Sequence, residues 1–245
     1  MSKKKIIILS SFVLLIFVFL IIMFTIILPK INKEKEWEEQ VRQYYAAKIE
    51  IYEEENNKYS DYEVDVAFLG DSLTEGYDVT NYYQEFLVVN RGIGGETTIG
   101  LEKRMQVSVY DLKPKVVVML IGANNMNDMF SNYENLLNGL KENLPDTKVV
   151  ILSLTAMGGE HWGPKNQLAA YNNVKISKYA EKYGFYYVDL FTPLYDIESG
   201  QVYDGYTSDG GHFTKVGYDV VTSLVKPVVI EALNSFYEEN SFENR

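Results

Sequence analysis

The sequence predicts an α/β fold: a doubly wound three-layer sandwich with about five parallel strands, preceded by a single N-terminal transmembrane helix. Three observations lead to this prediction. The chain of 245 residues begins with a long uncharged apolar segment, and a stretch dense in Glu and Lys follows it. Beyond residue 62, short runs of β-branched residues alternate with helix-like segments, as they do in parallel sheets.

The first element is the apolar segment Ile6–Leu28, which contains no charged residue. At ~1.5 Å per residue, a helix of this length spans the ~30 Å hydrocarbon core of a bilayer. A cleavable signal peptide is the alternative, but its apolar region is usually only ~7–15 residues long and ends in small residues. The lysines at positions 3 to 5 favour a cytoplasmic N-terminus. We therefore expect residues 1–29 to form a retained single-pass anchor in the cell membrane, with the remaining chain extracytoplasmic.

The second element is a charged segment, residues 30–61, which we expect to form a helical stalk. Its apolar residues recur at steps of three and four, the spacing of an amphipathic helix. They are Trp37, Val41, Tyr44, Tyr45 and Ile49. Composition favours a solvated stalk. Packing of the apolar stripe onto the following domain, or self-association through it, are the alternatives.

The third element, residues 62–245, is predicted as one domain. Several of its apolar runs are continuous rather than alternating, as expected for strands buried on both faces. The predicted strands are Val64–Leu69, Phe86–Asn90, Val116–Ile121, Val149–Leu154 and Phe185–Leu190. The predicted helices are Thr97–Leu112, Ser131–Asn143, Asn166–Tyr183 and Lys215–Phe236, the last kinked at Pro227. This alternation predicts a flavodoxin-like arrangement, in which ligands bind beyond the carboxyl ends of the strands.

Composition excludes several classes of function. The 34 acidic residues outnumber the 23 basic ones, which argues against a nucleic-acid partner. The absence of Cys excludes thiol nucleophiles, disulfides and Cys-ligated zinc or iron–sulfur sites. With two His and no His-Glu-x-x-His sequence, we expect no metal site and no cofactor.

Polar residues and glycines follow the first three predicted strands. Ser72 lies in Gly-Asp-Ser-Leu-Thr directly after the first strand, although Asp-Ser is also an ordinary helix N-cap. Gly95 lies in Gly-Ile-Gly-Gly-Glu-Thr-Thr after the second, which fits neither a dinucleotide-binding nor a phosphate-binding glycine loop. Asn124 lies in Gly-Ala-Asn after the third, where a turn-capping role is the alternative.

A second group of polar residues precedes the last predicted helix, in Ser-Asp-Gly-Gly-His-Phe-Thr. Asp209 and His212 are three residues apart, so both side chains can face one point from a single loop. The Asp can orient the imidazole while the imidazole accepts the Ser72 proton, as nucleophilic acyl transfer requires. A surface turn is the alternative. Each of the four motifs is weak evidence for a catalytic site when taken alone. Their occurrence together, in this order and each at a strand end or before the last helix, is much stronger evidence.

The combination resembles the SGNH (GDSL-type) hydrolase family over about Val64 to Phe236. The resemblance implies that Ser72 is the nucleophile, His212 the general base and Asp209 its partner. It also implies an oxyanion hole formed by the backbone N–H groups of Ser72 and Gly95 and by the Asn124 side chain. Family members usually carry Gly-x-Asn-Asp, whereas Asn125 follows Asn124 in this sequence. We expect this difference to affect the packing of the loop more than the activity.

From this resemblance we expect a serine esterase that acts through an acyl-enzyme. Because the domain is expected to face outward on a membrane anchor, we expect its substrates to be O-acyl, in particular O-acetyl, esters of cell-surface carbohydrate. The predicted partners are an ester substrate, either an acylated carbohydrate or a lipid, and the membrane. Lipid or lysophospholipid hydrolysis, acyl transfer to another acceptor and a catalytically inactive binding module are the alternatives. Aromatic residues expected in rim loops could stack on sugars, line an acyl groove or cover the core: Tyr77, Tyr82, Tyr83, His161, Trp162, Tyr203 and Tyr206.

Overall fold

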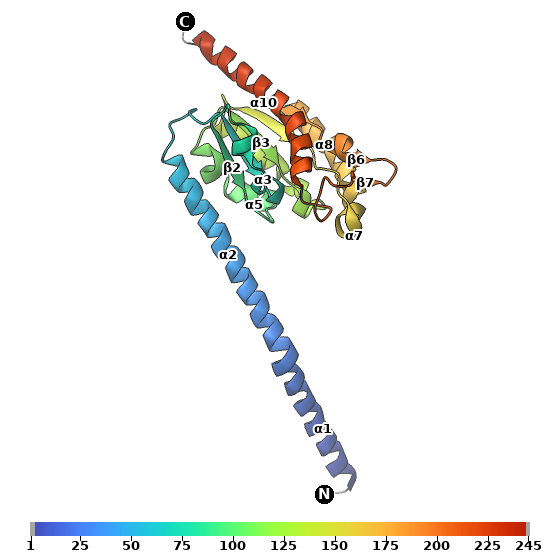
Figure 1. Ribbon diagram of the computed structural model, residues 1–245. Helices are drawn as coiled ribbons and strands as arrows, with labels where there is room; N and C mark the ends of the chain where they lie inside the picture. The colour runs from blue at the N-terminus through green and yellow to red at the C-terminus, as the bar shows by residue number, and fades with distance from the viewer. Residues whose placement is uncertain (1–2, 244–245) are drawn as a thin grey trace. The chain divides into compact units, whose positions relative to one another are not determined.

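The computed structural model describes residues 3–243 (Figure 1). Residues 1 and 2 of the predicted anchor, and 244 and 245 of the predicted domain 62–245, lie outside the described residues. The chain divides into two compact units, Met1–Lys48 and Ile49–Arg245.

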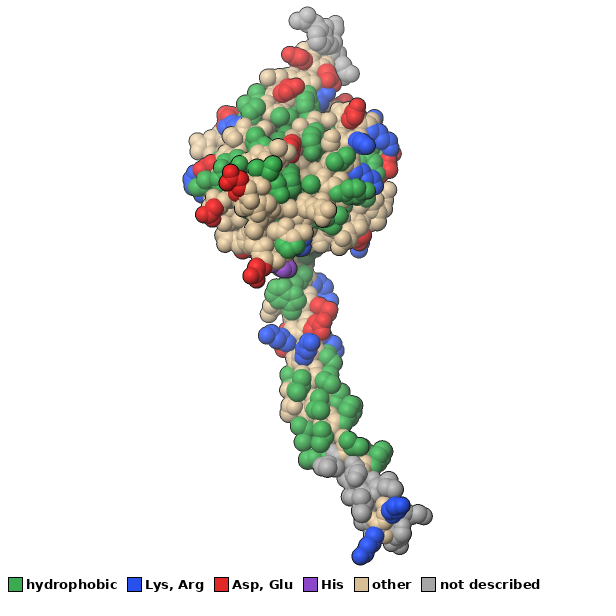
Figure 2. Space-filling model, turned by 90° about the vertical axis from the view of Figure 1, so that its right-hand side faces the viewer, with side chains coloured by type: hydrophobic (Ala, Val, Ile, Leu, Met, Phe, Trp, Pro, Cys, Tyr) green, Lys and Arg blue, Asp and Glu red, His purple; other side chains and the backbone are tan. Residues whose placement is uncertain are grey.

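The first unit is helical. It contains α1 (Lys3–Ile22), a π-helical turn η1 (Met23–Ile27) and most of α2 (Leu28–Asn56). One N-terminal helix is long and apolar enough to cross a membrane. The Thr25 hydroxyl donates a hydrogen bond of 2.7 Å to the Ile21 carbonyl, which satisfies this polar group within the apolar segment. Figure 2 shows a band of hydrophobic side chains followed by the charged side chains of α2.

The second unit contains a sheet of five parallel strands in the order β2-β1-β3-β4-β5. The strands are β1 (Val66–Gly70), β2 (Val88–Gly92), β3 (Val116–Leu120), β4 (Lys148–Leu152) and β5 (Tyr186–Val188). Every residue of β1 and β3 is buried, because helices cover both faces of the sheet. The predicted doubly wound α/β fold is therefore confirmed.

Strand boundaries differ from the predicted ones by up to two residues, most clearly at β2. The predicted segment Phe86–Asn90 becomes Val88–Gly92, so that Arg91 and Gly92 belong to the strand. Val88 lies opposite Val66 and Gly92 opposite Gly70. The register with β1, rather than local apolarity, sets where this edge strand ends.

Helices α5 (Thr98–Lys103), α6 (Tyr133–Asn143) and α8 (Asn166–Tyr183) pack on one face of the sheet. Their contacts include Leu101, Leu137 and Ile176 against Leu69, Val117 and Ile151. The helix predicted over Thr97–Leu112 is interrupted at Arg104, which caps α5, and resumes as the π-helical turn η2 (Gln106–Tyr110). This interruption directs Arg104 into the protein, where it is buried.

Helix α10 (Lys215–Glu243) covers the opposite face. Val221, Val225 and Val229 pack against strand residues such as Phe68 and Val118. The helix continues through Pro227, and its ribbon changes direction partway along its length (Figure 1), as a proline within a helix predicts.

Short elements occupy the loops of the second unit. The helical ones are α3 (Ser72–Glu75), α4 (Val79–Tyr82), η3 (Ala123–Asn125), η4 (Met129–Ser131), α7 (Gly159–Trp162), η5 (Gly163–Lys165) and α9 (Phe191–Leu194). The small antiparallel pair consists of β6 (Tyr195–Asp196) and β7 (Gln201–Val202).

The last turns of α2, from Ile49, belong to the second unit. Tyr52 is buried there, and its hydroxyl donates a hydrogen bond of 2.8 Å to the Gly92 carbonyl. Glu55 forms an ion pair with Arg91, whose guanidinium also lies 4.6 Å from the centre of the Tyr52 ring. The end of the segment predicted as a stalk is thus packed against β2.

Candidate active site

Ser72 begins α3, immediately beyond the carboxyl end of the central strand β1. The Asp71 carboxylate caps this helix by accepting a hydrogen bond of 3.0 Å from the Leu73 N–H. Gly92 allows the turn to lie against β2, because a Cβ there would lie only 2.2 Å from the Glu75 backbone nitrogen. The first backbone N–H groups of a helix lack intrahelical acceptors, so the Ser72 N–H is a suitable donor to an oxyanion.

Three side chains that are distant in sequence form a hydrogen-bonded chain. The Ser72 Oγ lies 3.0 Å from the His212 Nε2, and the His212 Nδ1 lies 2.7 Å from the Asp209 Oδ2. The other Asp209 oxygen accepts hydrogen bonds from the backbone N–H groups of Gly211 and His212. The order hydroxyl, imidazole, carboxylate is the one that activates a serine for acyl transfer.

The electrostatics of Asp209 suit this arrangement. Partial burial acts to raise the pKa of Asp209, but the hydrogen bonds from His212 and Gly211 outweigh it and lower the pKa to about 2. Asp209 is therefore a carboxylate throughout the neutral range, and can hold the His212 Nδ1 proton.

Asn124 lies on η3, directly after β3. Its Nδ2 donates a hydrogen bond of 2.9 Å to the Glu96 carbonyl, and an amide nitrogen carries a second N–H that can serve an oxyanion. The neighbouring Asn125 has a different role. Its side chain accepts from the Thr98 N–H and donates to the Thr98 hydroxyl, which ties η3 to the start of α5.

A small hollow brings these groups together. Its volume is about 20 Å³, and Ser72, His212 and Asn124 line it. Its other lining residues are Asp71, Leu73, Ala123, Thr155, Met157, Trp162 and Gly211. The Trp162 ring meets the His212 ring edge-on at 6.3 Å, so Trp162 belongs to the site and not merely to its rim.

Gly95 is not among the residues that line this hollow. It is exposed, with φ of +76°, a backbone conformation that favours glycine. The loop on either side is fixed, because the Gly94 N–H donates to the Glu75 carboxylate and the Glu96 N–H to the Ile93 carbonyl. The role of Gly95 as an oxyanion donor stays a prediction.

Asp71 is a buried carboxyl beside Ser72, and its Oδ2 has no hydrogen-bond partner among the described residues. Burial raises the pKa of Asp71 to about 6, and proximity to Glu96 adds to this. The Leu73 N–H and the attraction of His212 act in the opposite direction. In the sequence Asp71 is recognisable only as a helix cap.

A buried arginine joins the loops of the site, and sequence reasoning missed it. The Arg104 guanidinium donates to the Gly70 carbonyl, the Arg91 carbonyl and the Glu96 carboxylate at 2.9, 2.9 and 2.7 Å. Both Arg104 and Glu96 are almost fully buried. A single Arg within an expected helix carries no distinctive sequence signal. Its buried position becomes clear only from the structure, in which α5 ends at Arg104.

The aromatic residues expected at the rim separate into two groups. Tyr77 and Tyr83 are buried in the core, so the rim expectation was wrong for them. Tyr82 is half-buried and Tyr203 exposed. Among residues 3–243, no group of three His, Asp or Glu side chains is placed to hold a metal ion.

The chain is similar to many known proteins, of which three are described here. Platelet-activating factor acetylhydrolase IB subunit alpha2 from Rattus norvegicus is 28% identical over 198 residues, covering 73% of this chain and 82% of that protein. A GDSL-like lipase from Bacteroides thetaiotaomicron VPI-5482 is 26% identical with a TM-score of 0.66, covering 75% of this chain and 98% of the lipase. An acetyl xylan esterase from Geobacillus stearothermophilus is similar in fold, at 19% identity and a TM-score of 0.57 over 69% of this chain and 95% of that one.

The profile of the GDSL-like lipase/acylhydrolase family matches residues 68–220, more than half of the chain. The match begins within β1 and includes Ser72, Asn124, Asp209 and His212. The chain therefore belongs to the GDSL-like lipase/acylhydrolase family, a family of ester-hydrolysing enzymes.

Proposed function

We propose that this protein is a membrane-anchored serine esterase that removes O-acetyl groups from cell-surface carbohydrate. The observation that carries the proposal is the hydrogen-bonded chain from Ser72 through His212 to Asp209, with Asn124 lining the same hollow. This constellation supplies a nucleophile, a base, an orienting carboxylate and an oxyanion donor.

The reaction proceeds in two acyl-transfer steps. The Ser72 hydroxyl gives its proton to the His212 Nε2 as its oxygen attacks the ester carbonyl, and the carbonyl oxygen becomes an oxyanion. The Ser72 and Gly95 N–H groups and the Asn124 amide stabilise that oxyanion. His212 returns the proton to the departing alcohol, which leaves an acyl-Ser72 ester. A water molecule, deprotonated by His212, then cleaves this ester and releases the carboxylic acid.

The size of the hollow supports a short acyl group. Its volume is only about 20 Å³, which favours a short acyl group such as acetyl over a long chain. Met157 and Trp162 provide apolar lining beside Ser72. The platelet-activating factor relative is itself named an acetylhydrolase.

The N-terminal helix supports the location. Its length and apolarity suit a single membrane span, and the preceding lysines favour a cytoplasmic N-terminus. The catalytic unit would then face the cell exterior, where acetylated polysaccharide is within reach. Protease treatment of intact cells tests this orientation: degradation of the catalytic unit supports it, and protection contradicts it.

A series of p-nitrophenyl esters from acetyl to palmitoyl tests the acyl preference, using the full chain purified in detergent. We expect kcat/KM to be highest for acetate and to fall steeply with chain length, with no activity above background for Ser72→Ala. Activity that rises with chain length would contradict the acetyl assignment. Full activity in Ser72→Ala would contradict the serine mechanism.

Hydrolysis of a lipid acetyl ester is the second candidate. It is favoured by the 28% identity to a platelet-activating factor acetylhydrolase and by the membrane-type helix at the N-terminus.

The third reading, an inactive binding module, predicts a folded protein that a serine-directed fluorophosphonate does not label. We expect labelling of the parent chain and none of Ser72→Ala.

A further inference from the structure

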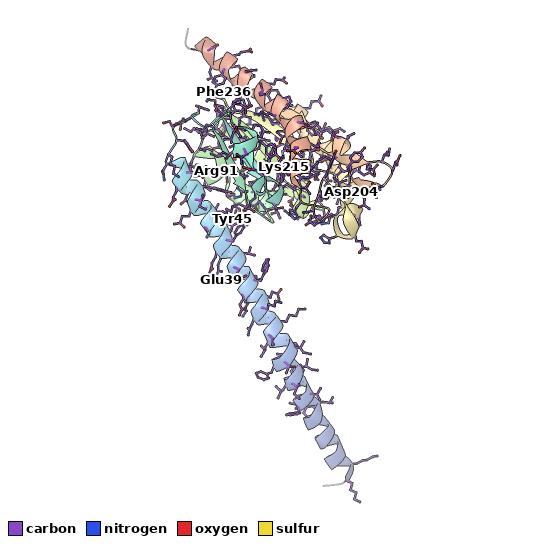
Figure 3. The ribbon with its side chains drawn as sticks, in the orientation of Figure 1. Glu39, Tyr45, Arg91, Asp204, Lys215 and Phe236 are labelled. Atoms are coloured by element: carbon purple, nitrogen blue, oxygen red, sulfur yellow. The ribbon has the colours of Figure 1, made fainter. Side chains whose placement is uncertain are left out.

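A short surface segment lies against the loop that carries Asp209 and His212. It consists of α7 and η5, residues 159–165, and it follows β4 in the chain. Figure 3 shows α7, in pale gold, at the outer edge of the second unit. The Gly158 N–H donates a hydrogen bond of 2.8 Å to the Gly210 carbonyl, and a Cβ at Gly210 would lie only 2.0 Å from the Gly158 carbonyl oxygen. The two backbones are therefore in direct contact, which fixes the start of the segment beside the proposed base.

The Trp162 ring of this segment covers Gly211. A Cβ at Gly211 would lie 2.8 Å from two atoms of the ring, Cε2 and Nε1. The ring also meets the His212 ring edge-on, with centroids 6.3 Å apart. Because residue 211 has no side chain, the indole can approach the hollow at Ser72, which Trp162 lines.

The neighbours of Trp162 hold its ring in place. The Lys165 ammonium lies 3.9 Å from the ring centre, a distance at which a cation is attracted to an aromatic face. The His161 ring meets the Trp162 ring edge-on at 4.9 Å. Trp162 also packs against the core cluster that includes Met157. These contacts keep the indole in position as part of the wall of the hollow.

Trp162 differs from the other large apolar residues of this wall. Leu73 and Met157 are only 7% and 3% exposed, and both belong to the core clusters of the domain. Trp162 is half-buried and comes from the surface segment. A smaller residue at position 162 would thus enlarge the space beside Ser72 with less disturbance of the core than a change at Leu73 or Met157.

We propose that Trp162 determines the length of the acyl chain that the site accepts, because its indole closes the hollow beside Ser72. This inference rests on the proposed esterase function and identifies the residue that restricts its substrate. The hollow has a volume of only about 20 Å³. An acyl chain that extends beyond it would displace the indole from Gly211 and Lys165, and the loss of these contacts would oppose the reaction of that ester.

Support of the Asp209 and His212 loop is the alternative role for Trp162. The two roles differ in their consequences, because all acyl esters react at the same atoms. A misplaced His212 would lower kcat/KM for every ester by a similar factor, and this factor cancels in the ratio of two esters. A change in the space beyond the carbonyl carbon alters that ratio.

Kinetics of the full chain in detergent test the proposal, with p-nitrophenyl acetate, butyrate and hexanoate. These esters share one leaving group, so differences in kcat/KM report on the acyl part. The variants are Trp162→Ala and Trp162→Leu. The Leu variant retains an apolar contact with the core, and it decides the question if Trp162→Ala does not fold. Tyr171→Ala, which removes an exposed aromatic ring on α8, is the matched control.

We expect the ratio of kcat/KM for hexanoate to that for acetate to rise at least about 10-fold in Trp162→Ala, since one methylene in a hydrophobic pocket already changes kcat/KM by about this factor. The ratio should rise less in Trp162→Leu and should stay at the parent's value in Tyr171→Ala.

A ratio within about twofold of the parent's in the folded Trp162 variants would overturn the proposal, because a missing methylene contact exceeds that factor. An equal fall of kcat/KM for all three esters would overturn it as well, and would assign Trp162 to loop support. A parent that prefers hexanoate would contradict both this inference and the acetyl assignment. A parent inactive on all three esters would instead refute the esterase function, whereas an acetate-selective parent whose selectivity survives in both variants would refute the role of Trp162 alone.

Discussion

Arg104 donates a hydrogen bond of 2.9 Å to the backbone carbonyl of Gly70, two residues before Ser72. The same guanidinium binds the Glu96 carboxylate, and the Glu96 carbonyl accepts the bond that fixes Asn124. One buried cation therefore connects the loop that carries the proposed nucleophile with the loops that carry the proposed oxyanion donors. We infer that Arg104 positions these groups and does not touch the substrate.

The first prediction concerns this connection. Arg104→Lys keeps the charge but cannot reproduce the fork of hydrogen bonds, so the loops should shift relative to each other. We expect kcat for p-nitrophenyl acetate to fall by at least ~10-fold with little change in KM, because misplacement affects the transition state most. Lys103→Arg, at the exposed neighbouring position, should behave like the parent. An unchanged kcat in a folded Arg104→Lys protein would refute the positioning role.

The second prediction concerns Asn124 as an oxyanion donor. Asn124→Ala should lower kcat by ~10²–10³, the usual effect of removing one such donor, and should leave the circular dichroism spectrum intact. Asn127→Ala is the control, since Asn127 is exposed three residues further along. Asn125→Ala should instead lower the melting temperature, because it removes two hydrogen bonds to Thr98. A normal rate in Asn124→Ala would remove this residue from the oxyanion hole.

The third prediction concerns the pH dependence of stability. Asp71 has a pKa of about 6 in the folded protein, above its ordinary value of 3.8. Between these two values the native state binds more protons than the unfolded state, so the free energy of unfolding falls as pH rises from about 4 to 6. The loss is on the order of 3 kcal/mol and is complete above the folded pKa.

Denaturant titrations at pH 4, 5, 6 and 7 measure this effect. Asp71→Asn removes the titrating group, and should reduce the fall in unfolding free energy over this range by about the predicted amount. Asp128→Asn, at an exposed site, should keep the parent's profile. If Asp71→Asn follows the parent profile, Asp71 does not titrate in this range.

The fourth prediction concerns the end of α2. Glu55 pairs with Arg91, whose side chain is fully buried while that of Glu55 is partly exposed. Glu55→Gln would leave the cation with weaker partners, so the free energy of unfolding should fall by about 1–3 kcal/mol. Glu54→Gln, at the exposed adjacent position, should have little effect. Equal melting temperatures for the two variants would show that α2 does not stabilise the catalytic unit through this pair.

Local patterns in the sequence were sufficient for much of the fold. The apolar run from Ile6, the β-branched runs and their alternation with helices predicted the candidate membrane helix and the five-stranded parallel sheet, which the structure contains. A strand that is buried on both faces of a sheet is a continuous run of apolar residues. Such a run can be recognised in the sequence without knowing which distant segments it contacts. The motifs after the first and third strands predicted Ser72 and Asn124 as candidate site residues, and the motif before the last helix predicted Asp209 and His212.

Only the tertiary structure decided which distant groups meet. The 3.0 Å contact of Ser72 with His212 joins residues 140 positions apart. The Arg104 bonds and the packing of Tyr52 on β2 depend on the crossing of several elements. Sequence spacing encodes local geometry, whereas buried polar contacts form between whichever donors and acceptors the packed elements bring together. That is why Arg104 carried no signal in the sequence and holds a central place in the folded site.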